Sequence, residues 1–234
     1  MSIDKRTYKT PFKIGSVFFQ KKDSLGKVSK VDSRILPLKI DNRQKISPID
    51  QQGNSSACVC FSTCSIAEAY FWRRNGYPIN FDALELYSHC KMADGHPNID
   101  GTYLEVGLKC ALENGLFGEV RNQEVRLIQN NGRNSSYIDD LKHAIFKYDF
   151  VLGGFGVMST IYDLDAKNYT MQHVGKREGG HCMAIVGYNS VGFIIANSWG
   201  KEWGQKGFAI CPYDVFAKEF IYGGYIANSL NDLN

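Results

Sequence analysis

Residues 50–72 read DQQGNSSACVCFSTCSIAEAYFW, and this stretch decides how the rest of the sequence is interpreted. It begins as a polar loop with one glycine and then becomes apolar on nearly every side. No glycine or proline follows Ala57 until Gly76. A run that is apolar all round and lacks helix breakers predicts a buried helix of about four turns from Ala57 to Trp72. Cys58 falls in the first turn of that helix.

A cysteine in the first turn of a buried helix is a candidate nucleophile. The thiolate is the reactive form, and both the positive end of a helix dipole and a nearby imidazolium favour it. His181 can supply the imidazole, because it opens an expected strand directly after Gly179 and Gly180, which leave space around the ring. Asn197 ends the next expected strand, where its amide can orient the imidazole. We interpret Cys58 as nucleophile, His181 as base and acid, and Asn197 as the group that holds His181.

Acyl transfer also needs hydrogen-bond donors for the oxyanion that forms when the thiolate attacks. The backbone N–H of Cys58 is one such donor, and the side chain of Gln52, in the preceding loop, is a candidate for the second. A metal site is the competing interpretation of this cysteine-rich stretch. The spacing of Cys58, Cys60 and Cys64 is not a usual zinc pattern, so we interpret Cys60 and Cys64 as core residues and predict no metal and no cofactor.

Three segments resemble those of papain-like cysteine peptidases, and they occur in the family's order. Residues 50–62 resemble the active-site segment, residues 179–188 the histidine segment, and residues 193–208, which contain NSWG, the asparagine segment. His181 lies 123 residues after Cys58, slightly short of the roughly 130–150 residues typical of the family. The resemblance covers about residues 46–215.

The resemblance implies an α+β fold of two lobes with the active-site cleft between them. A helical lobe of about residues 52–127 would carry Cys58 on its central helix. An antiparallel, β-barrel-like lobe of about residues 128–234 would carry His181 and Asn197.

The resemblance also assigns roles to residues around the nucleophile. It places Gln52 in the oxyanion hole and Trp199 as a cover over the contact between asparagine and histidine. It implies that an extended peptide binds along the backbone at Asp100 and Gly101, with Gly180 and Trp199 among the substrate-binding residues.

The chain departs from the usual family pattern at several positions. Ser55 and Ser56 replace the common Cys and Gly, and Val59 replaces the Trp after the nucleophile. The form Gln-Gly-Asn-x-x-x-Cys, followed later by Asp-Gly-Thr, looks closest to a subset of the family that is often microbial. Asp100 stands where many relatives have Gly, so the resemblance does not give the substrate preference.

The remaining pattern is helical first and strand-like later, which indicates an α+β arrangement rather than alternating βαβ units. Gly115 is expected to end one of the helices, and Asn189-Ser190 to form a turn between two strands. Residues 121–137 are polar and expected to form a loop. We predict further helices at 82–91, 103–114 and 137–147, and strands at 150–157, 182–188, 192–197 and 208–211.

Charge divides the chain into a basic N-terminal arm, residues 1–45, and a catalytic domain, residues 46–234. The arm carries twelve Lys or Arg and four Asp, a net charge of +8, whereas the remainder has a net charge of −5. Such an arm could lie across its own body and regulate the site, bind an acidic partner such as nucleic acid, or be a solvated tail.

The seven cysteines give an indication of whether the protein's cellular location is oxidising or reducing. The number is odd, and we find neither a secretory signal nor a stretch approaching the roughly 18 apolar residues of a membrane span. We therefore expect an intracellular, reducing location such as the cytoplasm.

These features predict a cysteine endopeptidase that acts on peptide or protein substrates. An isopeptidase or amidase using the same residues is a close alternative. Transglutaminase-like acyl transfer usually pairs the histidine with Asp, so Asn197 argues against it. The alternative from another class is a catalytically silent binding or structural protein that has kept the fold.

Overall fold

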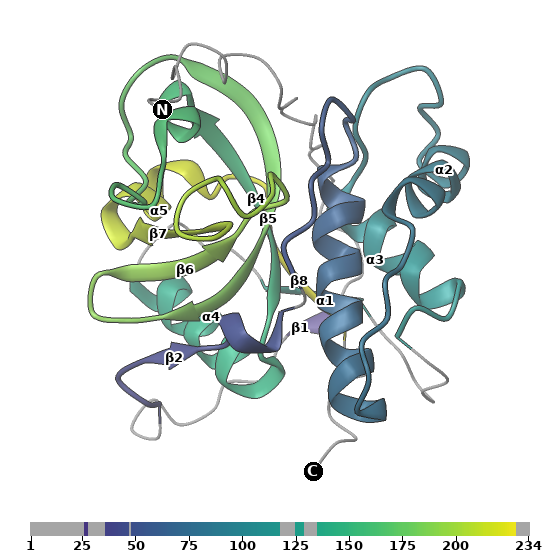
Figure 1. Cartoon of the computed structure of the whole chain (residues 1–234), viewed down its shortest axis with the longest axis horizontal. Helices are drawn as coiled ribbons and strands as arrows, with labels where there is room; N and C mark the ends of the chain where they lie inside the picture. Colours follow the sequence, from purple (N-terminus) through teal and green to yellow (C-terminus); the bar gives the residue numbers. More distant parts are fainter. Residues whose placement is uncertain (1–25, 28–35, 47, 118–124, 129–134, 228–234) are drawn as a thin grey trace.

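The computed structural model describes residues 26–27, 36–46, 48–117, 125–128 and 135–227 (Figure 1). Most of the predicted basic arm, residues 1–25 and 28–35, lies outside these ranges. None of the helices in the described ranges is both long and apolar enough to cross a membrane. The helices are α1 (Cys58–Asn75), α2 (Ala83–Ala93), α3 (Leu104–Glu113), α4 (Ser135–Tyr148) and α5 (Tyr213–Glu219). The strands are β1 (Gly26–Lys27), β2 (Ile40–Asp41), β3 (Val125–Ile128), β4 (Val151–Met158), β5 (Arg177–Tyr188), β6 (Gly192–Ala196), β7 (Phe208–Pro212) and β8 (Gly223–Ala227).

The predicted helices are confirmed as α1 to α4, with ends that differ by one to three residues. α1 ends where Gly76 adopts the left-handed φ of 76°, and the N–H of Gly76 donates to the carbonyl of Trp72. α2 begins after Asp82, whose carboxylate accepts the N–H groups of Leu84 and Glu85 and so satisfies two donors at the open helix end.

One sheet contains all the described strands, in the order β1-β3-β8-β4-β5-β6-β7, with β2 pairing on β5. The pairs are antiparallel except for β1 with β3. The four predicted strands are confirmed, but β5 begins at Arg177, so His181 lies inside the strand rather than at its start. Among the described strands the sheet is open, so the expected barrel-like lobe is a curved sheet without closure.

Several elements were not predicted. β3 falls within residues 121–137, so the prediction of a loop there is wrong for Val125–Ile128. β8 has the sequence GGYIA, whose two glycines disfavour a strand, yet it pairs with β3 on one side and β4 on the other. Pairing with neighbours distant in the sequence overrides such a weak local preference.

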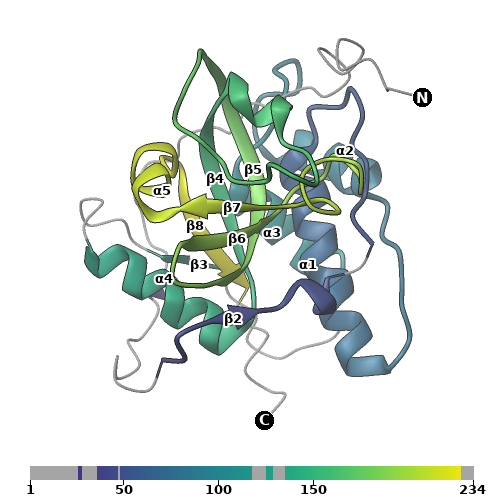
Figure 2. The ribbon, with the colours of Figure 1, turned by 60° about the vertical axis from the view of Figure 1, so that its left-hand side comes forward.

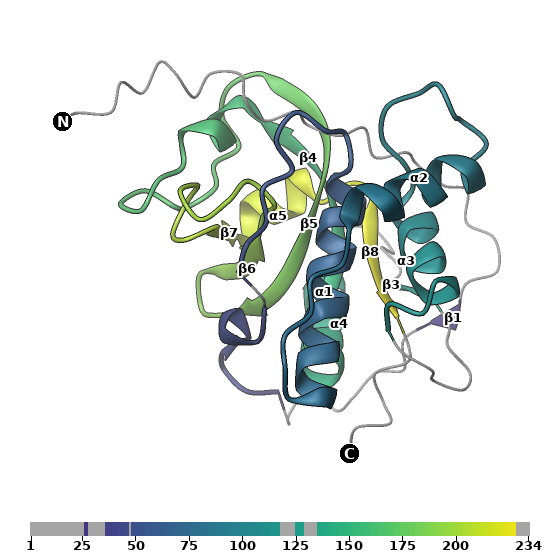
Figure 3. The same ribbon diagram turned by 45° about the vertical axis from the view of Figure 1, so that its right-hand side comes forward.

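The sheet separates two apolar cores. Leu152, Cys182 and Ala184 pack with α1, α2 and α3. Met183 and Ile185 point the other way, as alternation along a strand requires, and pack with residues of α4 and α5. Figures 1 and 3 show α1 between the sheet and the pair α2 and α3, and Figure 2 shows α4 and α5 beyond the sheet on the opposite side.

The described end of the basic arm, residues 36–45, packs on the sheet. Ile40 and Asp41 pair with Tyr188 and Gly187 of β5. The hydroxyl of Tyr188 also donates to the carbonyl of Pro37 at 2.9 Å. This part of the arm is therefore integrated with the β lobe, while the role of the arm as a whole stays a prediction.

Asp149 connects this segment to α1 and to the end of α4. Its carboxylate accepts from Lys45 at 2.7 Å and pairs with Arg73, and its carbonyl accepts from the Asn42 side chain at 2.9 Å. Asp149 does this with a φ of 63°, a conformation that Asp and Asn tolerate better than most residues.

Substitutions at Asp149 should separate the contribution of its ion pairs to stability from that of its positive φ. Both cations are roughly half exposed, so losing the ion pairs in Asp149→Asn should lower the free energy of unfolding by only about 1 kcal/mol. Asp149→Ala should cost about 2 kcal/mol, because alanine is also strained at positive φ. Urea denaturation of the two variants measures the difference, and equal stabilities would rule out the conformational contribution.

Candidate active site

Cys58 is the first residue of α1 and is fully buried. One turn further along, the hydroxyl of Ser62 donates to the carbonyl of Cys182 at 3.2 Å, which joins α1 to β5. Cys182 faces α1, and the Cys58 sulfur contributes to raising the pKa of the Cys182 thiol, although burial is the larger cause. The start of α1 is therefore packed beside the residue that follows His181.

His181 and Asn197 form the hydrogen bond that the sequence predicted. Nε2 of His181 lies 2.8 Å from Oδ1 of Asn197. The same oxygen accepts the backbone N–H of Ser198 at 2.8 Å, which fixes the orientation of the amide. Because Asn197 presents an acceptor, Nε2 must carry the proton, and the lone pair of the neutral ring is on Nδ1.

This tautomer leaves Nδ1 of His181 as the basic atom. Nδ1 is buried and has no hydrogen-bond partner in the described part of the chain. Burial lowers the pKa of His181 to about 4, and the hydrogen bond with Asn197 offsets only part of that effect. At neutral pH the imidazole is therefore neutral and able to accept a proton.

The loop before α1 pairs with the segment after Asn197. Gln51 and Trp199 form a β-bridge, and the N–H of Gln52 donates to the carbonyl of Ser198 at 2.8 Å. The Gln52 side chain is held at both ends: Oε1 accepts from the Ser198 hydroxyl at 2.6 Å, and Nε2 donates to the Ser55 carbonyl at 3.0 Å. These bonds fix Gln52 next to the segment that orients His181.

Trp199 lies against the histidine. Its ring centroid is 4.9 Å from that of His181 and is tilted by 33°. On its other sides Trp199 stacks on Tyr162 at 5.4 Å and meets Trp203 edge-on at 5.8 Å. This wall of aromatic rings excludes water from the ring of His181, which is fully buried.

A family model described as "Papain family cysteine protease" matches residues 36–216. The chain belongs to this family. Among curated family relatives, Oryzain gamma chain of Oryza sativa subsp. japonica is 26% identical over 200 residues, which cover 76% of this chain and 55% of that protein. Thiol protease aleurain of Arabidopsis thaliana is 25% identical over 203 residues, which cover 76% and 56%. The chain thus spans just over half the length of these relatives.

Solved structures show the same papain-family fold. Xylellain, a cysteine protease from Xylella fastidiosa, superimposes with a TM-score of 0.70 at 17% identity, covering 93% of this chain and 97% of that one. Procathepsin B from Trypanosoma congolense gives a TM-score of 0.67 at 17% identity, covering 94% and 86%. At these identities the likeness shows the fold alone.

The predicted peptide-binding residues lie at two places. Asp100 is exposed in the loop between α2 and α3, and Gly101 follows it with a φ of 91°. Gly180 lies in β5 next to His181, where an added Cβ would come within 3.0 Å of the Tyr222 hydroxyl. The role of these residues in binding stays a prediction.

α3 begins shortly after Gly101, and its first turn packs against β4, which pairs with the strand that holds Gly180. A Cβ at Gly154 would lie 3.1 Å from Cδ1 of Leu104, and Gly154 pairs with Cys182. α3 also lies close to α1, since a Cβ at Gly107 would approach Val59 to 2.5 Å. The loop that carries Asp100 and Gly101 thus leads directly into a helix that packs against Val59, the residue after Cys58, and against β4 where β4 pairs with Cys182.

All seven cysteines are buried and lie outside any disulfide, and the described residues contain no cluster of ligands suited to a metal ion. Burial raises the pKa of Cys60 and Cys182, so both thiols stay protonated at neutral pH. Sequence reasoning did not identify Ser198 as the link between Gln52 and Asn197. The signal that the sequence offered was the position of Ser198 inside the NSWG motif.

Proposed function

We propose that this chain is a cysteine endopeptidase whose nucleophile is Cys58. The hydrogen bond between His181 and Asn197 carries the proposal, because it leaves the basic Nδ1 atom of His181 unprotonated in a member of the papain family. The fully buried Cys58 begins a helix of 18 residues, whose dipole favours a thiolate at that end.

In the proposed mechanism, the Cys58 thiol gives its proton to Nδ1 of His181, and the sulfur attacks the peptide carbonyl carbon. The carbonyl electrons move to oxygen, which the backbone N–H of Cys58 and the amide of Gln52 stabilise. When the C–N bond breaks, His181 protonates the leaving amine. His181 then takes a proton from water, and the hydroxide attacks the thioester. The C–S bond breaks to release the carboxylic acid, and His181 returns its proton to the sulfur.

Extended peptide substrates are proposed to bind along the backbone of residues 100–102, with Gly180 and Trp199 on the His181 side. The loop form Gln-Gly-Asn-x-x-x-Cys supports placement in the microbial-type subset of the family. Seven cysteines outside any disulfide support a reducing, intracellular compartment.

We further propose that the basic arm, residues 1–45, regulates the site or binds an acidic partner. The support is its net charge of +8. Deleting residues 1–35 should raise peptidase activity if they inhibit. Binding of nucleic acid that weakens steeply with salt would instead support the acidic partner.

Labelling with a peptidyl epoxide or vinyl sulfone tests the proposed activity. Mass spectrometry should find one label per chain, on Cys58, and the labelled protein should no longer cleave a fluorogenic peptide. If the folded protein takes up no label, or takes it up on another cysteine, the catalytic assignment is wrong.

A further inference from the structure

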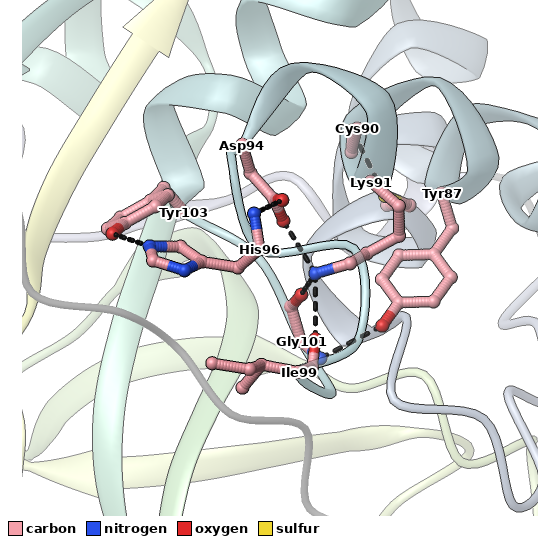
Figure 4. Close-up of polar contacts among 9 residues, drawn as sticks. Tyr87, Cys90, Lys91, Asp94, His96, Ile99, Gly101 and Tyr103 are labelled. Atoms are coloured by element: carbon pink, nitrogen blue, oxygen red, sulfur yellow. Dashed lines mark hydrogen bonds and ion pairs between the residues drawn. The ribbon is translucent and has the colours of Figure 1, made fainter.

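Lys91 lies in the last turn of α2, and its ammonium group bonds to the loop that joins α2 to α3 (Figure 4). It donates to Oδ2 of Asp94 at 2.7 Å, to the carbonyl of Ile99 at 2.7 Å and to the carbonyl of Gly101 at 2.9 Å. An ammonium has three hydrogens, and these bonds can use each of them. The Lys91 side chain is 14% exposed and that of Asp94 is 0% exposed.

Both peptide groups of Gly101 are hydrogen-bonded to side chains of α2. Its carbonyl accepts from Lys91, and its N–H donates to the hydroxyl of Tyr87 at 2.9 Å. Tyr87 and Lys91 are four residues apart and share one face of α2. Because the φ of Gly101 is 91°, these two side chains together fix an unusual turn of the backbone.

Stability alone does not explain why a buried ion pair stands at this position. Burial raises the pKa of Asp94, but hydrogen bonds from Lys91 and from the His96 N–H outweigh it and hold the pKa below its ordinary value. A buried ion pair seldom stabilises a fold more than apolar side chains of the same size. An apolar pair, however, could not hold the carbonyls of Ile99 and Gly101.

We propose that Lys91 is a positioning residue for extended-peptide binding: its ammonium sets the orientation of the backbone at residues 99–101, which precedes α3 and the proposed peptide-binding edge. The inference rests on the proposed function. Loss of Lys91 should weaken the use of extended peptides while leaving the chemistry of Cys58 and His181 intact, because its ammonium donates to Asp94 and to the carbonyls of Ile99 and Gly101.

Two probes of Cys58 in the full-length protein test this inference. Iodoacetamide is too small to span the edge, whereas a peptidyl epoxide extends along it. We expect Lys91→Met to lower the ratio of the two alkylation rate constants, epoxide over iodoacetamide, by about tenfold. For an extended fluorogenic peptide, KM should rise by a similar factor, with kcat within about twofold.

Two further variants keep the test decisive if Lys91→Met folds poorly. Tyr87→Phe removes only the acceptor for the Gly101 N–H and should shift the ratio in the same direction, without leaving Asp94 unpaired. Lys218→Met removes a lysine from α5 that is 53% exposed and whose partner Asp214 is 75% exposed, and it should leave the ratio unchanged.

The outcomes separate this inference from the proposed function. An active wild type whose Lys91 and Tyr87 variants keep the wild-type ratio and KM would overturn the positioning role alone. Parallel loss of both alkylation rates would also overturn it, because Lys91 would then support the whole fold. A wild type that neither probe labels at Cys58 would overturn the proposed function and this inference together.

Discussion

Cys58→Ala is expected to lower kcat/KM for peptide hydrolysis by about 10⁵-fold or more. The sulfur is the atom that forms the acyl-enzyme, and no other described thiol can replace it. Cys60 and Cys182 are fully buried with raised pKa values, so they do not offer a thiolate at neutral pH. Losses of this size are typical when the nucleophile of a catalytic group is removed.

The measurement is the hydrolysis rate of a fluorogenic peptide at matched protein concentration, with circular dichroism to confirm folding. Cys58→Ser is expected to be nearly as inactive, because a hydroxyl gives up its proton to an imidazole far less readily than a thiol does. Cys64→Ala is the matched control: Cys64 is buried on the same helix, and burial raises its pKa. Substantial activity in Cys58→Ala would contradict the mechanism.

The sequence predicted the parts of the site that depend on local order. An apolar run without helix breakers placed Cys58 in the first turn of α1, and the turn at Asn189 placed His181 on one strand and Asn197 directly after the next. In the structure Asn189 accepts the N–H groups of Val191 and Gly192, as such a turn requires. These features follow from neighbours in the chain, which a single sequence records.

The parts that sequence reasoning missed depend on which segments the folded chain brings together, from 8 and 10 positions apart at Lys91 to 146 positions apart at Ser198. Ser198 bonds to Gln52 across 146 positions, and nothing in either neighbourhood indicates the other. In the sequence, Lys91 is an ordinary cation near a helix end. Only the folded loop brings the carbonyls of Ile99 and Gly101 to its ammonium. β8 becomes a strand only because β3 and β4 flank it.

His181→Ala is expected to remove the reactivity of Cys58 at acidic pH. In the wild type, the fully protonated pair of Cys58 and His181 should lose its first proton with an apparent pKa near 4, the value to which burial lowers the imidazole. Above that pH the two groups share one proton, which the neutral imidazole can take from sulfur as the thiol is alkylated. Alkylation by iodoacetamide should therefore be nearly constant from about pH 5 upward and fall below pH 4.

Without the imidazole, Cys58 has no base to take its proton. Its alkylation rate should then rise about tenfold per pH unit through the neutral range, because thiolate forms only as the thiol itself ionises. At pH 5 the variant should react about 10³-fold more slowly than the wild type, and peptide hydrolysis should be lost at every pH. The measurement is the second-order rate constant of alkylation from pH 3.5 to 9.

His173→Ala is the control, because His173 pairs with Glu219 away from Cys58 and should leave the profile unchanged. Asn197→Ala should give an intermediate profile: it removes the bond that raises the pKa of His181 and also the acceptor that keeps the proton on Nε2. A wild-type profile that falls by half near pH 6.5 would show an imidazole titrating as it does in water. That result would contradict the buried, neutral base on which the proposed acyl transfer depends.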